Sequence, residues 1–355
     1  MPYLALVIIF CCSLFPLGQV AEAASASLGA GAVGEPFRLQ EPAKFKEAKV
    51  EFKADGPTLL FSDSPEMVYK DGILYKDQVK GRVRLFFHHV NATSDHKKLA
   101  VVVKNTGLRP LQLQVLKAGI AGPDYNYLQA GKEAQQLYFT SGDKSKVQLG
   151  YARHQELLTG RGLNLPPNTL VTGMVDLDLS EEAEIIVQMS SIYNNVELFS
   201  RQAKQQPIDE HPLRGTFTKA DWHYSLKNKV KAGKRPTMVH LAGPNRGYAL
   251  GRDATTGLPA ENYGNYGILY QLDFTVDGTK PVQLIFDPIG GEFAGYAVLE
   301  HCGSTKVLPM QGKDQLALGK NYEEALVLDK LEPGEYTLYW SPPGSGNLPV
   351  RFWWQ

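Results

Sequence analysis

The sequence predicts an all-β protein made of two β-sandwich domains, immunoglobulin-like or jelly-roll-like, with one short helix. Short runs of β-branched and aromatic residues recur along most of the 355-residue chain, separated by Gly, Pro, Asn and Asp. Residues 124–140 break this rhythm with the apolar spacing of a short amphipathic helix. A chain of this length is also typical of two domains. Short strands spaced by turn residues are characteristic of sandwiches and jelly rolls.

Residues 1–26 have the composition of a secretory signal peptide. Residues 4–17 form an apolar run, and a stretch with small residues that suit a cleavage site follows it at 21–26. The run is shorter than the roughly 20 apolar residues that cross a bilayer. No Lys or Arg precedes the run, so a buried N-terminal strand or helix is the alternative interpretation. We expect export, with the protein secreted or held in the cell envelope.

Composition divides the rest of the chain into three parts. Residues 27–45 are rich in Gly, Ala and Pro and predict a flexible linker or arm. An N-terminal β-sandwich domain is expected over residues 46–200 and a C-terminal one over residues 213–355. Residues 200–212 are polar, contain two prolines and have no apolar period, so they predict the domain boundary.

Each predicted domain contains a series of expected strands. In the first domain these are residues 82–90, 99–105, 110–117, 146–149, 170–177 and 184–190. In the second they are residues 215–226, 237–241, 267–276, 281–286, 295–301, 325–328, 334–340 and 350–354. Residues 331–336 resemble a tyrosine corner, in which the hydroxyl of Tyr336 would bond to the preceding backbone. Residues 350–354 alternate as in a closing strand with one buried face.

Cysteine usage and charge exclude several classes of protein. Loss of residues 1–26 removes Cys11 and Cys12, which leaves Cys302 as the one cysteine of the mature chain. An internal disulfide and a multi-cysteine metal site are then excluded, and we expect Cys302 to be buried and unreactive. The 37 basic and 37 acidic residues balance, so no general field attracts nucleic acid. No later segment has transmembrane length.

The histidines give little support to a metal site. His88 and His89 are adjacent in an expected strand, where successive side chains point to opposite faces. The best-placed trio for zinc or copper is His223, His240 and His301, which come from distant strands. Ordinary core or surface imidazoles are the favoured interpretation. We therefore expect no bound metal and no cofactor.

No motif identifies catalytic residues. The nearest match to a nucleophile elbow is Gly344-Ser345-Gly346, but no helical pattern follows it, so it predicts a tight loop between the last two strands. Asn91-Ala92-Thr93 fits a glycosylation sequon.

The densest aromatic region, residues 248–270, is the candidate ligand-binding segment. Tyr248, Tyr263 and Tyr266 lie among Gly and Asn, with Arg252 and Asp253 between them. Tyr with Asn and Gly in a long loop is typical of surfaces that bind sugars or peptides, because the ring stacks and the polar groups bond. A packed loop that crosses the end of a sheet has the same composition, so binding and packing both remain open.

Several segments resemble one group of exported bacterial proteins. Residues 64–138 contain SPEMVYKDGILYKDQVKGRVRLFFHHVN and LAVVVKNTGLRPLQLQVLKAGIAGP. Together with residues 263–276 and 331–350, they are similar to proteins labelled as carrying a copper amine oxidase N-terminal-like domain. The resemblance covers about half of the chain. It implies export and an envelope setting, and it implies no catalysis.

The residues that an oxidase of that name would need are missing from the sequence. Copper amine oxidases form a quinone from the Tyr of an Asn-Tyr-Asp/Glu motif and hold copper with a His-x-His pair and a third His. Here Gly264 follows Asn262-Tyr263, and the chain contains no His-x-His.

The sequence therefore favours an exported, non-enzymatic binding or structural protein of the cell envelope or extracellular space. Cell-wall polysaccharide or another envelope protein is the expected partner, and nucleic acid is not. One alternative is a carbohydrate-binding module that uses residues 248–270. A second alternative is a hydrolytic or metal-dependent enzyme.

Overall fold

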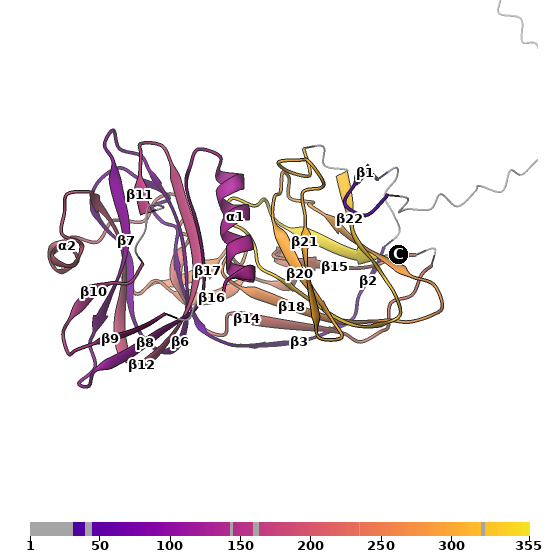
Figure 1. Ribbon diagram of the computed structural model, residues 1–355, viewed down its shortest axis with the longest axis horizontal. Coiled ribbons are helices and arrows are strands. Elements are labelled where there is room, and N and C mark those ends of the chain that lie inside the picture. Colours follow the sequence, from indigo (N-terminus) through magenta and orange to yellow (C-terminus); the bar gives the residue numbers. More distant parts are fainter. Residues whose placement is uncertain (1–30, 40–44, 143–144, 159–162, 234, 321–323) are drawn as a thin grey trace, which may run out of the picture.

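The computed structural model describes residues 31–39, 45–142, 145–158, 163–233, 235–320 and 324–355. The expected signal peptide lies outside the described residues. β-strands dominate these ranges, which hold two α-helices, so the prediction of an all-β fold with a short helix is confirmed. Figure 1 shows two lobes side by side, with helix α1 (Tyr127–Thr140) between them. In the part of the chain described, neither helix has the length and apolar character to span a bilayer.

The first lobe is one twelve-stranded sheet. Its strands are β4 (Thr58–Ser62), β5 (Met67–Val68), β6 (Gly72–Asn91), β7 (Lys97–Asn105), β8 (Leu111–Asp124), β9 (Lys146–Leu149), β10 (His154–Glu156), β11 (Asn164–Leu165), β12 (Leu170–Ser191), β13 (Arg214–Phe217), β16 (Ala249–Arg252) and β17 (Pro259–Asn262). Helix α2 (Val196–Gln202), which was not expected, follows β12.

Two long strands bend this sheet around its own core. β12 pairs with β6 along most of its length, while its first half also pairs with β8 and its second half with β7. The register shifts between Leu179 and Ala183, opposite Gly81, whose φ is 74°. A bulge bends a strand, and Gly adopts positive φ without strain. The two halves therefore face each other across buried residues such as Phe87 and Val101.

The second lobe is a sandwich of two six-stranded sheets. The strands of one sheet, in spatial order, are β1 (Pro36–Arg38), β22 (Glu324–Leu331), β19 (Val282–Asp287), β24 (Val350–Trp354), β15 (Thr237–Leu241) and β2 (Lys46–Glu47). Those of the other are β21 (Ser304–Pro309), β20 (Tyr296–His301), β23 (Gly334–Trp340), β18 (Leu269–Val276), β14 (Asp221–Leu226) and β3 (Val50–Asp55). A 3₁₀ turn, η2 (Pro244–Arg246), follows β15.

A continuous apolar core joins the sandwich to the first lobe. Trp340, Phe352 and Trp354 fill the space between the two sheets of the sandwich. The same cluster extends to Phe61 and Phe86 of the first lobe. The lobes therefore share a buried interface.

Strand pairing crosses the limits expected for the two domains. β2 and β3, from the start of the expected N-terminal domain, pair with β15 and β14 of the sandwich. In the other direction β13 pairs with β4 and carries the hairpin β16–β17 into the first lobe. The periodicity of a strand shows which face is buried, whereas its partner depends on contacts far along the chain.

The end of the chain is buried on both faces, whereas the sequence predicts one buried face. β24 lies between β19 and β15 in the middle of its sheet. Phe352 and Trp354 face the sandwich core, and Trp353 on the opposite face is fully buried as well. The rings of Phe37 and Phe45 cover Trp353, at centroid distances of 6.5 and 5.2 Å. The segment expected to be a flexible arm therefore supplies a strand, β1, and part of this cover.

Local features of the fold follow the sequence closely. Helix α1 begins after Asn126, whose side chain accepts a hydrogen bond from the backbone N–H of Gln129. The tyrosine corner is confirmed, because the hydroxyl of Tyr336 donates to the carbonyl oxygen of Glu332 at 2.9 Å. The expected domain boundary at residues 200–212 is a packed crossover: the backbone N–H of Gln206 donates to the carbonyl oxygen of Ile73 at 2.7 Å.

Candidate functional site

The hairpin β16–β17 carries much of the Tyr-rich segment at the edge of the first lobe. β17 is the last strand of the sheet, and Leu250 lies opposite Glu261. Alternation in a strand places one set of side chains on the outward side of the hairpin. We call this set the hairpin face, and it consists of Tyr248, Leu250, Arg252, Pro259, Glu261 and Tyr263.

The hairpin face combines apolar and polar groups that are open to solvent. Leu250 is 74% exposed and Tyr263 is 54% exposed. The rings of Tyr248 and Tyr263 meet edge to face, with centroids 5.3 Å apart. Tyr263 is exposed and Tyr248 is half-buried, so the pair offers flat apolar surface together with hydroxyl groups.

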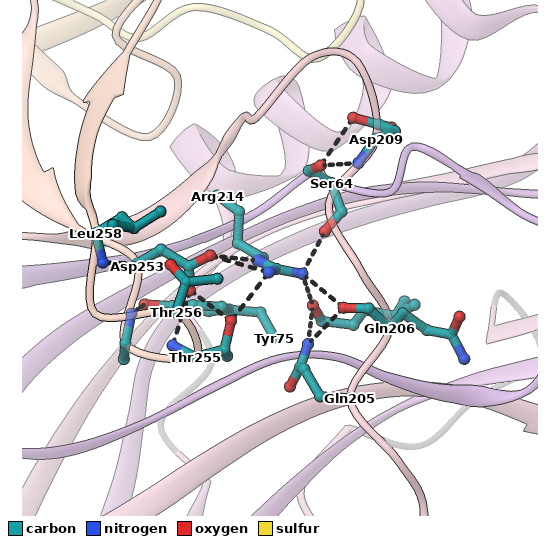
Figure 2. Close-up of polar contacts among 12 residues, drawn as sticks. Ser64, Tyr75, Gln205, Gln206, Asp209, Arg214, Asp253, Thr255, Thr256 and Leu258 are labelled. Carbon is teal, nitrogen blue, oxygen red and sulfur yellow. Dashed lines mark hydrogen bonds and ion pairs between the residues drawn. The ribbon is translucent and has the colours of Figure 1, made fainter.

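A buried arginine anchors the turn of this hairpin. Figure 2 shows Arg214 of β13, whose Nε and Nη2 donate to Oδ2 of Asp253 at 3.1 and 2.9 Å. The Oδ1 atom of Asp253 accepts from the backbone N–H and the hydroxyl of Thr255. Burial alone raises the pKa of Asp253, but the bonds from Thr255 and Arg214 outweigh it, so the pKa lies below its usual value. Asp253 thus holds the turn in place.

The other donors of Arg214 reach neighbouring loops. Nη1 donates to the carbonyl oxygens of Ser64, Leu74 and Gln206 at 3.0–3.1 Å. The hydroxyl of Ser64 in turn donates to Asp209 at 2.8 Å, as Figure 2 also shows. The side chain of Arg214 is 1% exposed, so these bonds form in a medium where an unpaired donor is costly.

A polar groove of about 530 Å³ begins at Arg252, next to the hairpin face. Its walls come from β6, β12, the segment after α2 and the hairpin with its turn. They are lined by Lys76, Asp77, Gln78, Glu182, Glu184, Gln205, Arg252, Ala254 and Thr255. Opposite charges are paired across it: Nη2 of Arg252 lies 3.8 Å from Asp77, and Nζ of Lys76 lies 3.5 Å from Glu184. This mixed lining suits a neutral, hydroxyl-rich ligand better than an ion.

The structure separates the five residues predicted to bind a ligand. Tyr248, Arg252 and Tyr263 share the hairpin face, whereas Asp253 belongs to the anchor beneath it. Tyr266 turns inward, where its ring lies 6.1 and 6.0 Å from those of Phe61 and Phe86. Its hydroxyl donates to the carbonyl oxygen of Gly346 at 3.0 Å.

The three histidines considered for a metal lie in different surroundings. Nε2 of His223 is 2.9 Å from Asp55, and the ring of His301 stacks on Tyr336 at 4.2 Å. His240 lies on β15, in the opposite sheet. Across the described ranges, no group of three or more His, Cys, Asp or Glu side chains could hold a metal ion.

A cavity of about 270 Å³ at the junction of the lobes has no counterpart in the sequence analysis. We call it the junction cavity; it is lined by Asp63, Glu66, Phe86, His88, Tyr127, Leu213, Tyr266, Gly344 and Ser345. These residues come from segments far apart in the chain, so no local motif could have revealed it.

Ser345 and His88 meet in this cavity, but they are not arranged as a catalytic triad. Oγ of Ser345 lies 3.3 Å from Nε2 of His88, and Glu66 lies 3.9 Å from the same nitrogen. A triad needs the acid on the other ring nitrogen. Nδ1 of His88 is buried and has no hydrogen-bond partner in the described part of the chain. Burial also lowers the pKa of His88 to about 3, which makes it a poor general base.

Two sequence expectations outside these sites are corrected. Cys302, expected to be buried, is exposed, because it occupies the turn between β20 and β21 with a φ of 48°. The sequon asparagine, Asn91, is fully buried, and its amide nitrogen donates to the carbonyl oxygens of Asp95 and Leu165. Its side chain is not accessible for glycosylation in the folded protein.

Comparisons with known proteins identify no family. No protein-family model matches the chain, and no curated protein matches it. Vicilin from Corylus avellana (hazelnut) is 7% identical, with 90% of this chain and 86% of that chain covered and a TM-score of 0.14. Vicilin from Solanum lycopersicum (tomato) is 12% identical, with 83% and 84% covered and a TM-score of 0.11. A mutant of salicylate 1,2-dioxygenase from Pseudoaminobacter salicylatoxidans is 10% identical, with 78% and 68% covered and a TM-score of 0.11. Similarities at this level support no conclusion.

Proposed function

We propose that the protein is an exported, non-enzymatic binding protein that attaches to polysaccharide of the cell envelope through the hairpin face. The observation that carries the proposal is the pair formed by exposed Tyr263 and half-buried Tyr248 beside a polar groove. Sugar rings offer flat apolar faces to aromatic side chains and hydroxyl groups to polar ones. The hairpin face and the groove supply these two kinds of surface side by side.

The position of the hairpin supports a binding role. From Tyr248 to Arg252 the strand extends roughly 13 Å, at about 3.3 Å per residue. Arg214 fixes the far end of the hairpin through Asp253, so the exposed side chains lie on a rigid support. A rigid surface loses little conformational freedom on binding, which favours affinity.

Retention on insoluble peptidoglycan and on a panel of neutral polysaccharides tests the proposal. Tyr263→Ala removes an exposed ring, so we expect an unchanged melting temperature and roughly 30-fold weaker retention, as for a binding hot spot worth about 2 kcal/mol. The matched control is Tyr193→Ala, because Tyr193 is 91% exposed in the turn between β12 and α2. Equal retention of the two variants, or no retention of the wild type on any of these materials, would refute the proposal.

Export is tested separately at the N-terminus. Small residues at the positions that a signal peptidase reads predict a mature chain that starts at Ala24 or Ser27. N-terminal sequencing of protein recovered from the medium or envelope measures this. Recovery of the intact chain with Met1 in the cytosol would contradict export.

A further inference from the structure

The junction cavity is lined by two carboxyl groups, of which that of Asp63 is buried and that of Glu66 is partly exposed. Asp63 and Glu66 come from the loop after β4, and Asp63 is only 9% exposed. Within the described residues, Oδ1 of Asp63 is buried without a hydrogen-bond partner. No Lys or Arg of the described ranges lines the cavity. A buried carboxylate oxygen without a partner is costly, and a bound donor would remove that cost.

The electrostatics of the cavity also favour a positive guest. Burial, and then the neighbouring carboxylates of Glu66 and Asp209, raise the pKa of Asp63 well above its usual value. Burial, and then Asp209, raise the pKa of Glu66. His88 in the same wall is neutral, because burial lowers its pKa to about 3. The raised pKa values mean that negative charge is disfavoured in the empty cavity, so a cation that stabilises the carboxylate form would bind in exchange for a proton.

Aromatic rings form the remaining walls. Phe86 of β6, Tyr127 at the start of α1, and Tyr266 line the cavity together with the two carboxyl groups. Phe86 and Tyr266 lie 6.0 Å apart between ring centroids. The face of an aromatic ring attracts a desolvated cation, and rings combined with carboxylates are a common way to bind ammonium groups.

We propose that the junction cavity binds a small organic cation, with its ammonium group between Asp63 and Glu66 and its carbon atoms against Phe86, Tyr127 and Tyr266. The volume of about 270 Å³ fits a small metabolite and excludes a polymer. The site does not depend on the hairpin face, so the two activities can be tested independently.

Hydrogen bonds fix the backbone of the loop that carries Asp63 and Glu66, which we call the acidic loop. Both carboxyl oxygens of Asp209 are engaged there: Oδ1 accepts from the hydroxyl of Ser64, and Oδ2 accepts from the backbone N–H of Glu66. The carbonyl oxygen of Ser64 is bonded to Arg214. The backbone that carries Asp63 and Glu66 is thus fixed from behind, which reduces the ordering cost of binding.

Isothermal titration with choline and ethanolamine on the full mature protein tests the proposal, and 3,3-dimethylbutan-1-ol serves as the uncharged isostere of choline. We expect at least one of the two cations to bind and the isostere to bind at least tenfold more weakly. Absence of binding by both cations at millimolar concentration, or equal binding of the isostere, would overturn the proposal.

Two carboxamide variants complete the test. Asp63→Asn keeps the shape of the side chain but cannot release a proton to become negative, so cation binding should fall at least tenfold while the melting temperature is maintained or raised. Asp178→Asn is the matched control, because Asp178 is exposed on β12 and lies far from the cavity. Thr172 on the same strand pairs with His88 of the cavity wall, and Asp178 is six residues, or roughly 20 Å, further along. If Asp63→Asn does not fold, Tyr127→Leu removes a ring face at the mouth and should weaken choline binding by a similar factor. Unchanged choline binding in folded Asp63→Asn or folded Tyr127→Leu contradicts the proposal. Tyr263→Ala, which changes the hairpin face, should bind choline as the wild type does.

Discussion

Replacement of Arg84 by Met should destabilise the protein by about 3–5 kcal/mol, because it leaves a buried carboxylate without its cation. The side chain of Arg84 is 2% exposed, and its Nε and Nη2 donate to Asp176 at 2.7 and 3.1 Å. Its Nη1 donates to Asp221 at 2.9 Å and to the carbonyl oxygens of Ala220 and Gly267. Asp176 belongs to the first lobe and the other three acceptors belong to the sandwich side. The guanidinium therefore ties the two lobes together.

Urea denaturation followed by two signals measures this loss. All four tryptophans, Trp222, Trp340, Trp353 and Trp354, lie in the sandwich, so their fluorescence reports the unfolding of that lobe. Far-UV circular dichroism reports both lobes. In Arg84→Met we expect a lower midpoint in both signals. Because the link between the lobes is also lost, the two midpoints should separate.

Arg82→Met is the matched control for this experiment. Arg82 lies two residues before Arg84 on β6 but is exposed, and substitutions at such positions usually change the free energy of unfolding by no more than about 0.5 kcal/mol. If the two variants lost the same stability, the buried ion pair would not hold the lobes together, and the reasoning would be refuted.

Three further predictions follow from single contacts. Burial lowers the pKa of His89 to about 4, so between about pH 4 and 6.5 the unfolded state binds more protons than the folded state. The free energy of unfolding should therefore fall by roughly 2 kcal/mol from pH 7.5 to 5. His89→Gln should show a correspondingly weaker pH dependence in urea denaturation. Tyr336→Phe removes the bond to the carbonyl oxygen of Glu332 and should cost about 1 kcal/mol of unfolding free energy; an unchanged urea midpoint would mean that the corner bond contributes nothing. Exposed Cys302 should react with a thiol reagent within minutes in the absence of denaturant, and slow labelling would place it in a closed turn.

Local patterns in the sequence were sufficient to place many elements. The expected strand at residues 350–354 is β24, and the expected helix at 124–140 is α1 apart from its first three residues, where Asn126 provides the cap. The same patterns did not show which strands pair with each other. Nothing in the alternation of β3 shows that it pairs with β14, more than 160 positions away in the chain, since periodicity reports faces and not neighbours. Cys302 was misjudged because β20 ends at His301, which places Cys302 in the exposed turn before β21.

For the candidate sites too, the sequence indicated a segment but not which of its side chains would be exposed. Composition identified the Tyr-rich segment, and the structure places Tyr248 and Tyr263 on one outward face. Composition could not distinguish Tyr263 from Tyr266, which turns inward. Between and after them the chain turns at Gly264 and Gly267, whose φ angles are 91° and 77°. The junction cavity was beyond sequence reasoning, since its walls are assembled from both lobes.

One buried guanidinium connects the two candidate sites physically. Arg214 has five N–H groups to satisfy, and it finds acceptors both in the hairpin turn, at Asp253, and in the acidic loop, at the carbonyl oxygen of Ser64. Displacement of either segment would leave a buried donor unpaired, which costs about 1–3 kcal/mol. The hairpin face and the mouth of the junction cavity are therefore fixed relative to each other by the same side chain. Arg214 follows the segment where the sequence predicted only a boundary between domains, and its bonds show why that segment is packed.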